Sequence, residues 1–85
     1  MRVFLKKIIR KRDDYQCQMC FIHQEELLIE TNRSLSIHHI DYNKKNSKLN
    51  NLISLCNNCH IQTNRNRVFW ENYFNIFLKN GIGIN

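Results

Sequence analysis

Two Cys-x-x-Cys pairs constrain this chain more than any other feature of its sequence. The first pair is Cys17 and Cys20, and the second pair is Cys56 and Cys59. Structural zinc prefers four tetrahedral ligands, and thiolates suit it well. Unrelated free cysteines would fall into two such pairs only by coincidence. The sequence therefore predicts a four-cysteine structural zinc site that ties the N-terminal part of the chain to a distant segment.

The length of 85 residues predicts a single small domain over residues 1–85. Domains of this size often need a staple such as a metal, although the 42% of hydrophobic residues allow a packed core. No stretch approaches the ~20 apolar residues of a membrane span, and lysines interrupt the apolar start, so we expect no signal peptide and no membrane partner. We expect a cytoplasmic protein whose reduced cysteines bind metal.

Positive charge is concentrated at the start of the chain. The sequence has 13 Lys and Arg residues against 7 Asp and Glu residues, which gives a formal net charge of +6. Many of the basic residues fall near the N-terminus: Arg2, Lys6, Lys7, Arg10, Lys11 and Arg12. A basic balance of this kind favours polyanions, with nucleic acid first among them, and simple solubility is the alternative explanation.

Hydrophobic periodicity in the first half of the chain predicts a helix and a β-hairpin. Residues 3–14 place apolar side chains on one helical face and basic side chains on the other. Residues 26–30, with the apolar run Leu27-Leu28-Ile29, and the alternating pattern of residues 35–40 flank a turn-like segment at 31–34. Two such runs around a turn predict a hairpin.

The second half of the chain predicts a loop, a strand and two helices. Residues 41–51 are polar and form a loop long enough to be functional, and residues 52–55 fit a returning strand. A helix is expected next, with Asn57 or Asn58 as its cap. Aromatic residues at spacings of three and four predict a further helix over residues 68–80.

Three histidines indicate a second kind of site. His38 and His39 are adjacent on the predicted strand, and His60 follows the second cysteine pair. One imidazole can bind a cation while another accepts a proton from water, because the pKa of histidine lies near neutrality. A bound cation would stabilise the charge that builds on a phosphate during hydrolysis. The pattern suits a one-metal phosphodiesterase.

Three segments together resemble the HNH endonuclease family, in its zinc-containing, phage or homing-type branch. The segments are residues 12–20, His38-His39-Ile40-Asp41 and residues 51–60, and the resemblance extends over residues 12–67. It implies an α+β chain with the small ββα-metal (His-Me finger) fold, a four-cysteine structural zinc site and flanking helices. It also implies a metal-dependent DNA endonuclease that leaves 5′-phosphate and 3′-hydroxyl ends.

The resemblance further implies a role for each residue of the motif. His39 takes the place of the general base, and Asn51 that of the asparagine that braces the loop and orients this base. His38 and His60 correspond to ligands of a catalytic divalent cation, for which Mg²⁺, Mn²⁺, Ni²⁺ and Zn²⁺ are candidates. Asn64 lies where relatives carry a further histidine ligand, so its ligation stays open.

Basic residues outside the motif are the candidates for contact with double-stranded DNA. The resemblance places Arg67 near the scissile phosphate. The other candidates lie in the first helix, in the polar loop and after His60: Arg10, Lys11, Arg12, Lys44, Lys45 and Arg65. Contacts to phosphates position DNA without reading its sequence. Either the enzyme is weakly specific, or it forms a homodimer, or a phage packaging or specificity partner selects the site.

Two other functions compete with the nuclease. One is a zinc-stabilised nucleic-acid-binding module without catalysis, and the other is an interaction domain that uses the aromatic helix. Neither needs three histidines together. The single domain is expected to consist of a basic N-terminal helix (1–14), a core with the zinc site and the ββα-metal motif (15–67), and an aromatic C-terminal helix (68–80).

Overall fold

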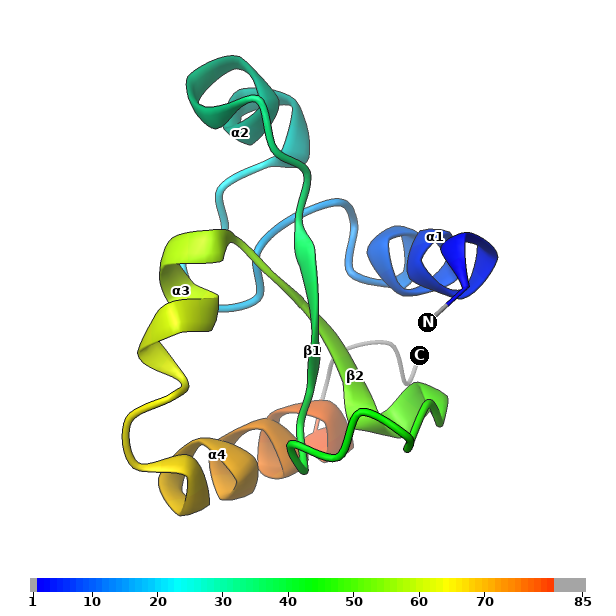
Figure 1. Cartoon of the computed structure of the whole chain (residues 1–85), viewed down its shortest axis with the longest axis vertical. Coiled ribbons are helices and arrows are strands. Elements are labelled where there is room, and N and C mark those ends of the chain that lie inside the picture. Colours follow the sequence, from blue (N-terminus) through cyan, green and yellow to red (C-terminus); the bar gives the residue numbers. More distant parts are fainter. Residues whose placement is uncertain (1, 81–85) are drawn as a thin grey trace.

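An antiparallel pair of short strands forms the centre of the fold (Figure 1). β1 (Ser36–His39) pairs with β2 (Leu52–Leu55) in a register that sets His39 opposite Leu52. This computed structural model describes residues 2–80. The long polar loop connects the two strands, and the expected strand–loop–strand–helix order of an α+β fold is confirmed.

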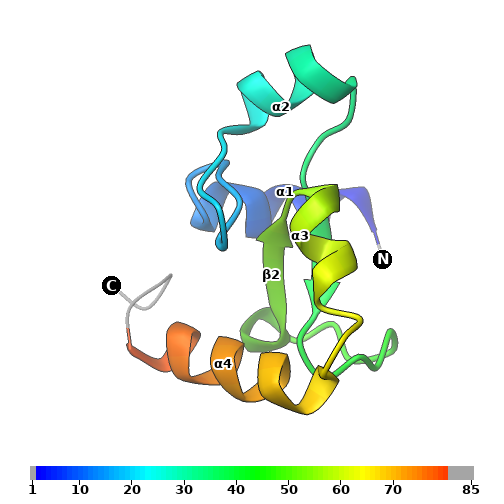
Figure 2. The same cartoon turned by 90° about the vertical axis from the view of Figure 1, so that its left-hand side faces the viewer.

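Helices surround the hairpin on several sides. They are α1 (Val3–Arg12), α2 (Gln24–Thr31), α3 (Asn57–Gln62) and α4 (Arg67–Asn80), and a short 3-10 helix, η1 (Leu49–Asn51), precedes β2. α4 lies across one end of the hairpin and α2 stands at the opposite end, with α1 and α3 on opposite sides (Figures 1 and 2). Within residues 2–80, no helix is both long and apolar enough to cross a membrane.

The hydrophobic core is built from the strands together with α2 and α4. Ile53 and Leu55 of β2 and Phe74 of α4 are fully buried. Burial of a side chain such as Phe74 contributes about 1.5–3 kcal/mol to stability. Trp70 and Phe77 pack partly buried against this core. The rings of the aromatic helix therefore cover the core with one face.

The predicted strand at residues 26–30 is wrong, because these residues lie in α2. His23 caps the start of this helix, since its Nδ1 accepts a hydrogen bond from the N–H of Glu25 at 3.1 Å. Asn32 ends the helix in the left-handed conformation, with a φ of 58°. Capping at both ends outweighs the short apolar run. β1 therefore pairs with β2 across the polar loop, and no tight turn joins it to the preceding segment.

α1 is shorter and less buried than its periodicity predicts. It ends at Arg12 because Asp14 and Tyr15 both adopt a positive φ of 57°. Ile9 is fully buried, whereas Phe4 on the same predicted face is 74% exposed. α1 therefore contacts the core through only part of its apolar face.

A buried carboxylate joins α1 to β2. Asp13, which is 2% exposed, accepts hydrogen bonds from the N–H of Ser54 at 2.9 Å and from Arg12 at 2.8 and 3.1 Å. Arg12 also donates to the carbonyl oxygens of Leu49 and Leu52, at 2.9 and 2.7 Å. A buried charge needs such partners. Arg12, predicted as a DNA contact, is therefore bound within the protein.

Asp13→Asn should lower the free energy of unfolding by about 2 kcal/mol, because an amide has one acceptor oxygen where the carboxylate serves three donors. Asp14→Asn is the matched control, since it makes the same chemical change at the exposed neighbouring residue. Urea unfolding followed by circular dichroism measures both variants. Equal midpoints for the two would contradict the role given to Asp13.

Candidate metal centre and catalytic cleft

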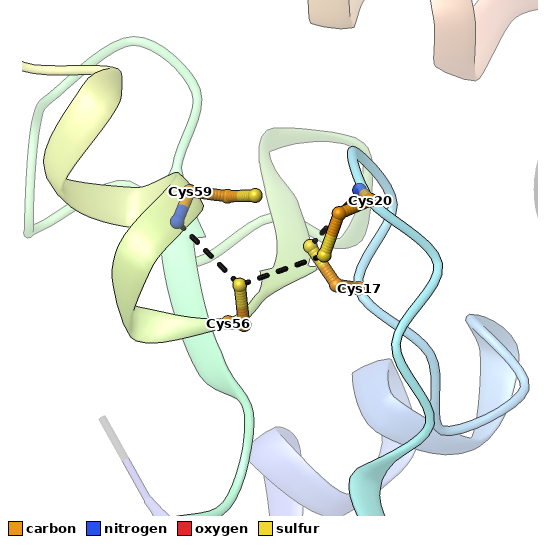
Figure 3. A group of neighbouring side chains, drawn as sticks. All are labelled: Cys17, Cys20, Cys56 and Cys59. Atoms are coloured by element: carbon orange, nitrogen blue, oxygen red, sulfur yellow. Dashed lines mark hydrogen bonds between the residues drawn. The ribbon is translucent and has the colours of Figure 1, made fainter. Parts of the chain in front are cut away.

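The four cysteines converge on one point (Figure 3). Cys17 and Cys20 come from the segment after α1, Cys56 directly precedes α3, and Cys59 lies in the first turn of α3. Their sulfur atoms all lie within 4.8 Å of one another, and those of Cys20 and Cys56 are 3.7 Å apart. Tetrahedral zinc with bonds of about 2.3 Å has sulfur–sulfur edges of about 3.8 Å. The cluster therefore has the size and composition to bind a metal ion.

Backbone N–H groups point at two of these sulfurs. The sulfur of Cys17 accepts from the N–H groups of Met19 and Cys20, at 3.4 and 3.5 Å. The sulfur of Cys56 accepts from the N–H of Cys59 at 3.5 Å, which makes Cys56 the cap of α3 in place of the predicted asparagines. Burial acts to raise the pKa of Cys17, but the N–H donors outweigh it and lower the pKa. The donors therefore favour the thiolate that a metal requires.

The other side of the cluster resists ionisation. Burial raises the pKa of the Cys59 thiol, and the nearby sulfurs of Cys56 and Cys17 raise it further. Several thiolates this close together repel one another unless a cation lies between them. The donor set is thus one that a bound metal would stabilise and that bare thiolates would not.

The first cysteine pair ends in a strained residue. Phe21 directly follows Cys20 with a φ of 65°, and a bulky residue in this left-handed region costs about 1–2 kcal/mol. The N–H of Phe21 donates to the carbonyl oxygen of Cys17 at 2.9 Å, which closes the turn. The tight turn that presents both sulfurs is therefore made without a glycine.

The three histidines line a single cleft of about 600 Å³. β1 ends at His39, so the side chains of His38 and His39 both reach this cleft although they are adjacent. The remaining lining residues come from α1, β1, the polar loop, the segment after α3 and the start of α4: Lys6, Ile37, Tyr42, Lys44, Asn64 and Arg67. The structure thus brings the predicted histidines and Asn64 together.

His38 is the most buried of the three histidines, with 2% exposure. Its ring centre lies 5.2 Å from that of His60 and 5.0 Å from that of Tyr42. Its Nε2 is buried and has no hydrogen-bond partner among the described residues. Burial lowers the pKa of His38 to about 4, and the neighbouring His60 adds to the effect. The imidazole is neutral at neutral pH and can offer a lone pair to a cation.

Burial lowers the pKa of His39 and of His60 as well. The carboxylate of Asp41 acts on His39 in the opposite direction, but burial dominates. The Nε2 of His39 is buried and, within residues 2–80, unpaired. All three imidazoles are therefore neutral at pH 7, as metal binding and proton abstraction both require.

Asn51 ties together the two ends of the loop that follows the histidines. Its carbonyl oxygen accepts from the N–H of Ile40 at 2.8 Å, and its Oδ1 accepts from the N–H of Asp41 at 3.1 Å. Its Nδ2 donates to Asp41 Oδ1 and to the carbonyl oxygen of Asn46, both at 2.9 Å. These bonds hold the backbone immediately after His39. Asp41 uses its carboxylate within this loop, as expected for a turn residue.

Tyr42 is a cleft residue that the sequence analysis missed. The guanidinium carbon of Arg67 lies 4.6 Å from the centre of its ring, whose edge packs on His38. Its hydroxyl donates to the carbonyl oxygen of Thr63. Its backbone has a φ of 62°, which is unfavourable for a bulky residue. One aromatic residue inside an otherwise polar loop is the signal that could have found it.

The predicted DNA contacts separate into three groups. Lys44 and Arg67 line the cleft, together with Lys6 from the predicted basic face of the first helix. Arg10 donates from Nε and Nη2 to the carbonyl oxygen of Leu35, at 3.1 and 2.8 Å, and forms with Arg12 the group that is bound to backbone carbonyls. The predicted contacts that are exposed and lie outside the cleft are Lys11, Lys45 and Arg65.

α3 connects the two sites, because Cys59 and His60 are consecutive residues of this helix. The hydroxyl of Thr63 donates to the carbonyl oxygen of His60 at 2.6 Å, where the helix ends. α3 stops at Gln62, so Asn64 lies outside the helix that carries His60. Asn64 reaches the cleft from the turn that follows the helix.

Comparison with known proteins gives one match. A family model described as HNH endonuclease matches residues 17–66, more than half of the chain. The matched segment contains the four cysteines and the three histidines of the cleft. No curated protein and no solved structure matches the chain. The chain belongs to the HNH endonuclease family.

Proposed function

We propose that this protein is a metal-dependent endonuclease that hydrolyses phosphodiester bonds of double-stranded DNA. The observation that carries the proposal is a cleft that three imidazoles line together with Lys6, Lys44 and Arg67. Neutral imidazoles can bind a cation or accept a proton, and the basic side chains attract phosphate. Membership of the family supports the same assignment.

His38 and His60 are assigned as the ligands of a catalytic divalent cation, with the amide oxygen of Asn64 as a third donor. The close approach of the two rings and the unpaired Nε2 of His38 support this choice. A bound cation would stabilise negative charge on the phosphate and on the departing 3′ oxygen. Ligands of this kind accept Mg²⁺, Mn²⁺, Ni²⁺ or Zn²⁺.

His39 is assigned as the general base that removes a proton from the attacking water. The loop bonds of Asn51 begin directly after His39, so Asn51 positions this base rather than contacting substrate. Arg67 lies against the Tyr42 ring, which directs a fixed positive charge at the cleft. That charge can pair with the phosphate that is being cleaved.

The four-cysteine cluster is assigned to structural zinc. Zinc here would join the segment after α1 to the start of α3 and so fix the helix that presents His60. The catalytic centre would then depend on a metal that touches no substrate.

A nucleic-acid-binding module without catalysis is the second candidate, because the basic cleft alone would support it. Supercoiled plasmid, offered with each of the four divalent ions in turn, distinguishes the two candidates. Nicked or linear product supports the nuclease. Binding without product under all four ions would replace it with the module.

His39→Ala should slow plasmid cleavage by about 10²–10⁴-fold, the usual contribution of a general base. His23→Asn is the control, because it removes a histidine outside the cleft and keeps an oxygen that can cap α2. The rate is read from the loss of supercoiled plasmid on gels. Equal rates for His39→Ala and the unaltered chain would show that another group is the base.

Cleavage should persist to a pH below 6.5 and then fall. Burial lowers the pKa of His39 from its ordinary 6.5, so the base stays neutral, and active, until the pH drops below that value. The logarithm of kcat/KM, measured against pH at saturating cation, gives the midpoint. A midpoint above 6.5 would contradict a buried histidine base.

Cys59→Ser should release the bound zinc, lower the free energy of unfolding by several kcal/mol and reduce cleavage. The loss of activity follows because Cys59 directly precedes His60 in α3. Asn58→Ser, at the exposed residue before it, is the matched control. Zinc content by metal analysis, thermal unfolding and plasmid cleavage are measured on both. Full zinc content in Cys59→Ser would refute the ligand set.

A further inference from the structure

A second hollow adjoins the catalytic cleft. It has a volume of about 530 Å³ and is formed by α1, the segment after α2, and β1. Lys6, Ile37 and His60 line both this hollow and the catalytic cleft. A ligand that occupies the cleft can therefore continue into the hollow past Lys6.

Positive charge lines both hollows. Lys44 and Arg67 line the catalytic cleft, Arg10 and Arg33 line the second hollow, and Lys6 lines both. No Asp or Glu from residues 2–80 lines either of them, although the chain contains 7 such residues. The second hollow, with Lys6, Arg10 and Arg33 but no carboxylate or thiolate, therefore suits an anion.

The backbone around the second hollow is held in place. Both Nε and Nη2 of Arg10 donate to the carbonyl oxygen of Leu35, which fixes the guanidinium on the segment that enters β1. Arg33 follows the left-handed Asn32, and its N–H donates to the hydroxyl of Thr31 at 3.2 Å. The base of the Arg33 side chain is thus set before any ligand binds, which lowers the entropic cost of binding.

We propose that the second hollow binds the phosphate next to the scissile one on the same DNA strand, through Lys6 and Arg33. This inference rests on the proposed function, because it takes the catalytic cleft as the place of the scissile phosphate. Successive phosphates of one strand occupy the adjoining hollows, and the strand leaves the cleft over Lys6 toward Arg33. The contact positions the strand without selecting its bases.

Binding of a fluorescently labelled DNA duplex at several salt concentrations tests the inference. The full chain is loaded with zinc and carries His39→Ala, so that the DNA is not cut during the measurement. Lys6→Gln and Arg33→Gln are each expected to weaken binding several-fold and to reduce the slope of log K against log salt by about 1, as for one lost phosphate contact. Lys7→Gln is the matched control: it removes the same charge from the adjacent, exposed residue of α1, which lines neither hollow.

Equal slope changes in Lys6→Gln and Lys7→Gln, or an unchanged slope in Arg33→Gln, would overturn the inference. Thermal unfolding of each variant shows whether it is folded. If Lys6→Gln is unfolded, the Arg33→Gln variant alone tests the inference, because Arg33 is exposed and its substitution leaves the core intact. The two proposals fail separately. If the unaltered chain cuts DNA but Arg33→Gln leaves the slope of log K against log salt unchanged, only the proposal for the second hollow is refuted. If the variants lose slope as expected but the unaltered chain cuts DNA with none of the four divalent ions, the second hollow is supported and the nuclease is refuted.

Discussion

The meeting of four cysteine sulfurs is the constraint on which the rest of the structure depends. It sets the segment after α1 against the start of α3, although α2 and the whole hairpin separate the two in sequence. A chain of 85 residues buries a smaller share of its surface than a larger domain does, so such a contact adds to what its small apolar core supplies. Asp13 adds a second attachment nearby through its bond to the N–H of Ser54. The cysteine cluster and the hydrogen bond of Asp13 together fix where α3 begins, and therefore the direction of the residues that follow.

A short series of contacts leads from the cysteine cluster to the cleft. His60 follows Cys59, and Thr63 bonds to the carbonyl oxygen of His60 through its hydroxyl. Thr63 in turn accepts from Tyr42, whose ring contacts His38 and supports the guanidinium of Arg67. Residues of β1, the loop, the end of α3 and α4 are thus joined by one set of contacts. A change at the cysteines would reach the imidazoles through them.

The spacing within each Cys-x-x-Cys pair predicted the cysteine cluster, and the residue types of His38, His39 and His60 predicted the cleft, although the parts of each site lie far apart in the sequence. The strand predicted at residues 26–30 was wrong, since capping by His23 decided the element and the apolar run did not. Tyr42 was missed because its contacts to Thr63 and Arg67 join residues that are distant in sequence. A basic residue such as Arg12 looks like any other in sequence, and only the fold shows that its guanidinium binds backbone carbonyls.

Residues 2–80 make their left-handed turns without glycine, and three of the residues that do so are large: Tyr15, Phe21 and Tyr42. Phe21 and Tyr42 have φ values of 65° and 62°, one beside the cysteine cluster and the other in the cleft. Glycine at either position would relieve backbone strain but would remove the ring. At Tyr42 that ring supports Arg67 and His38, so selection for a more stable chain and selection for an intact cleft would favour different residues. A screen for thermal stability alone would select glycine at position 42, and the cleft would lose the ring that contacts Arg67 and His38.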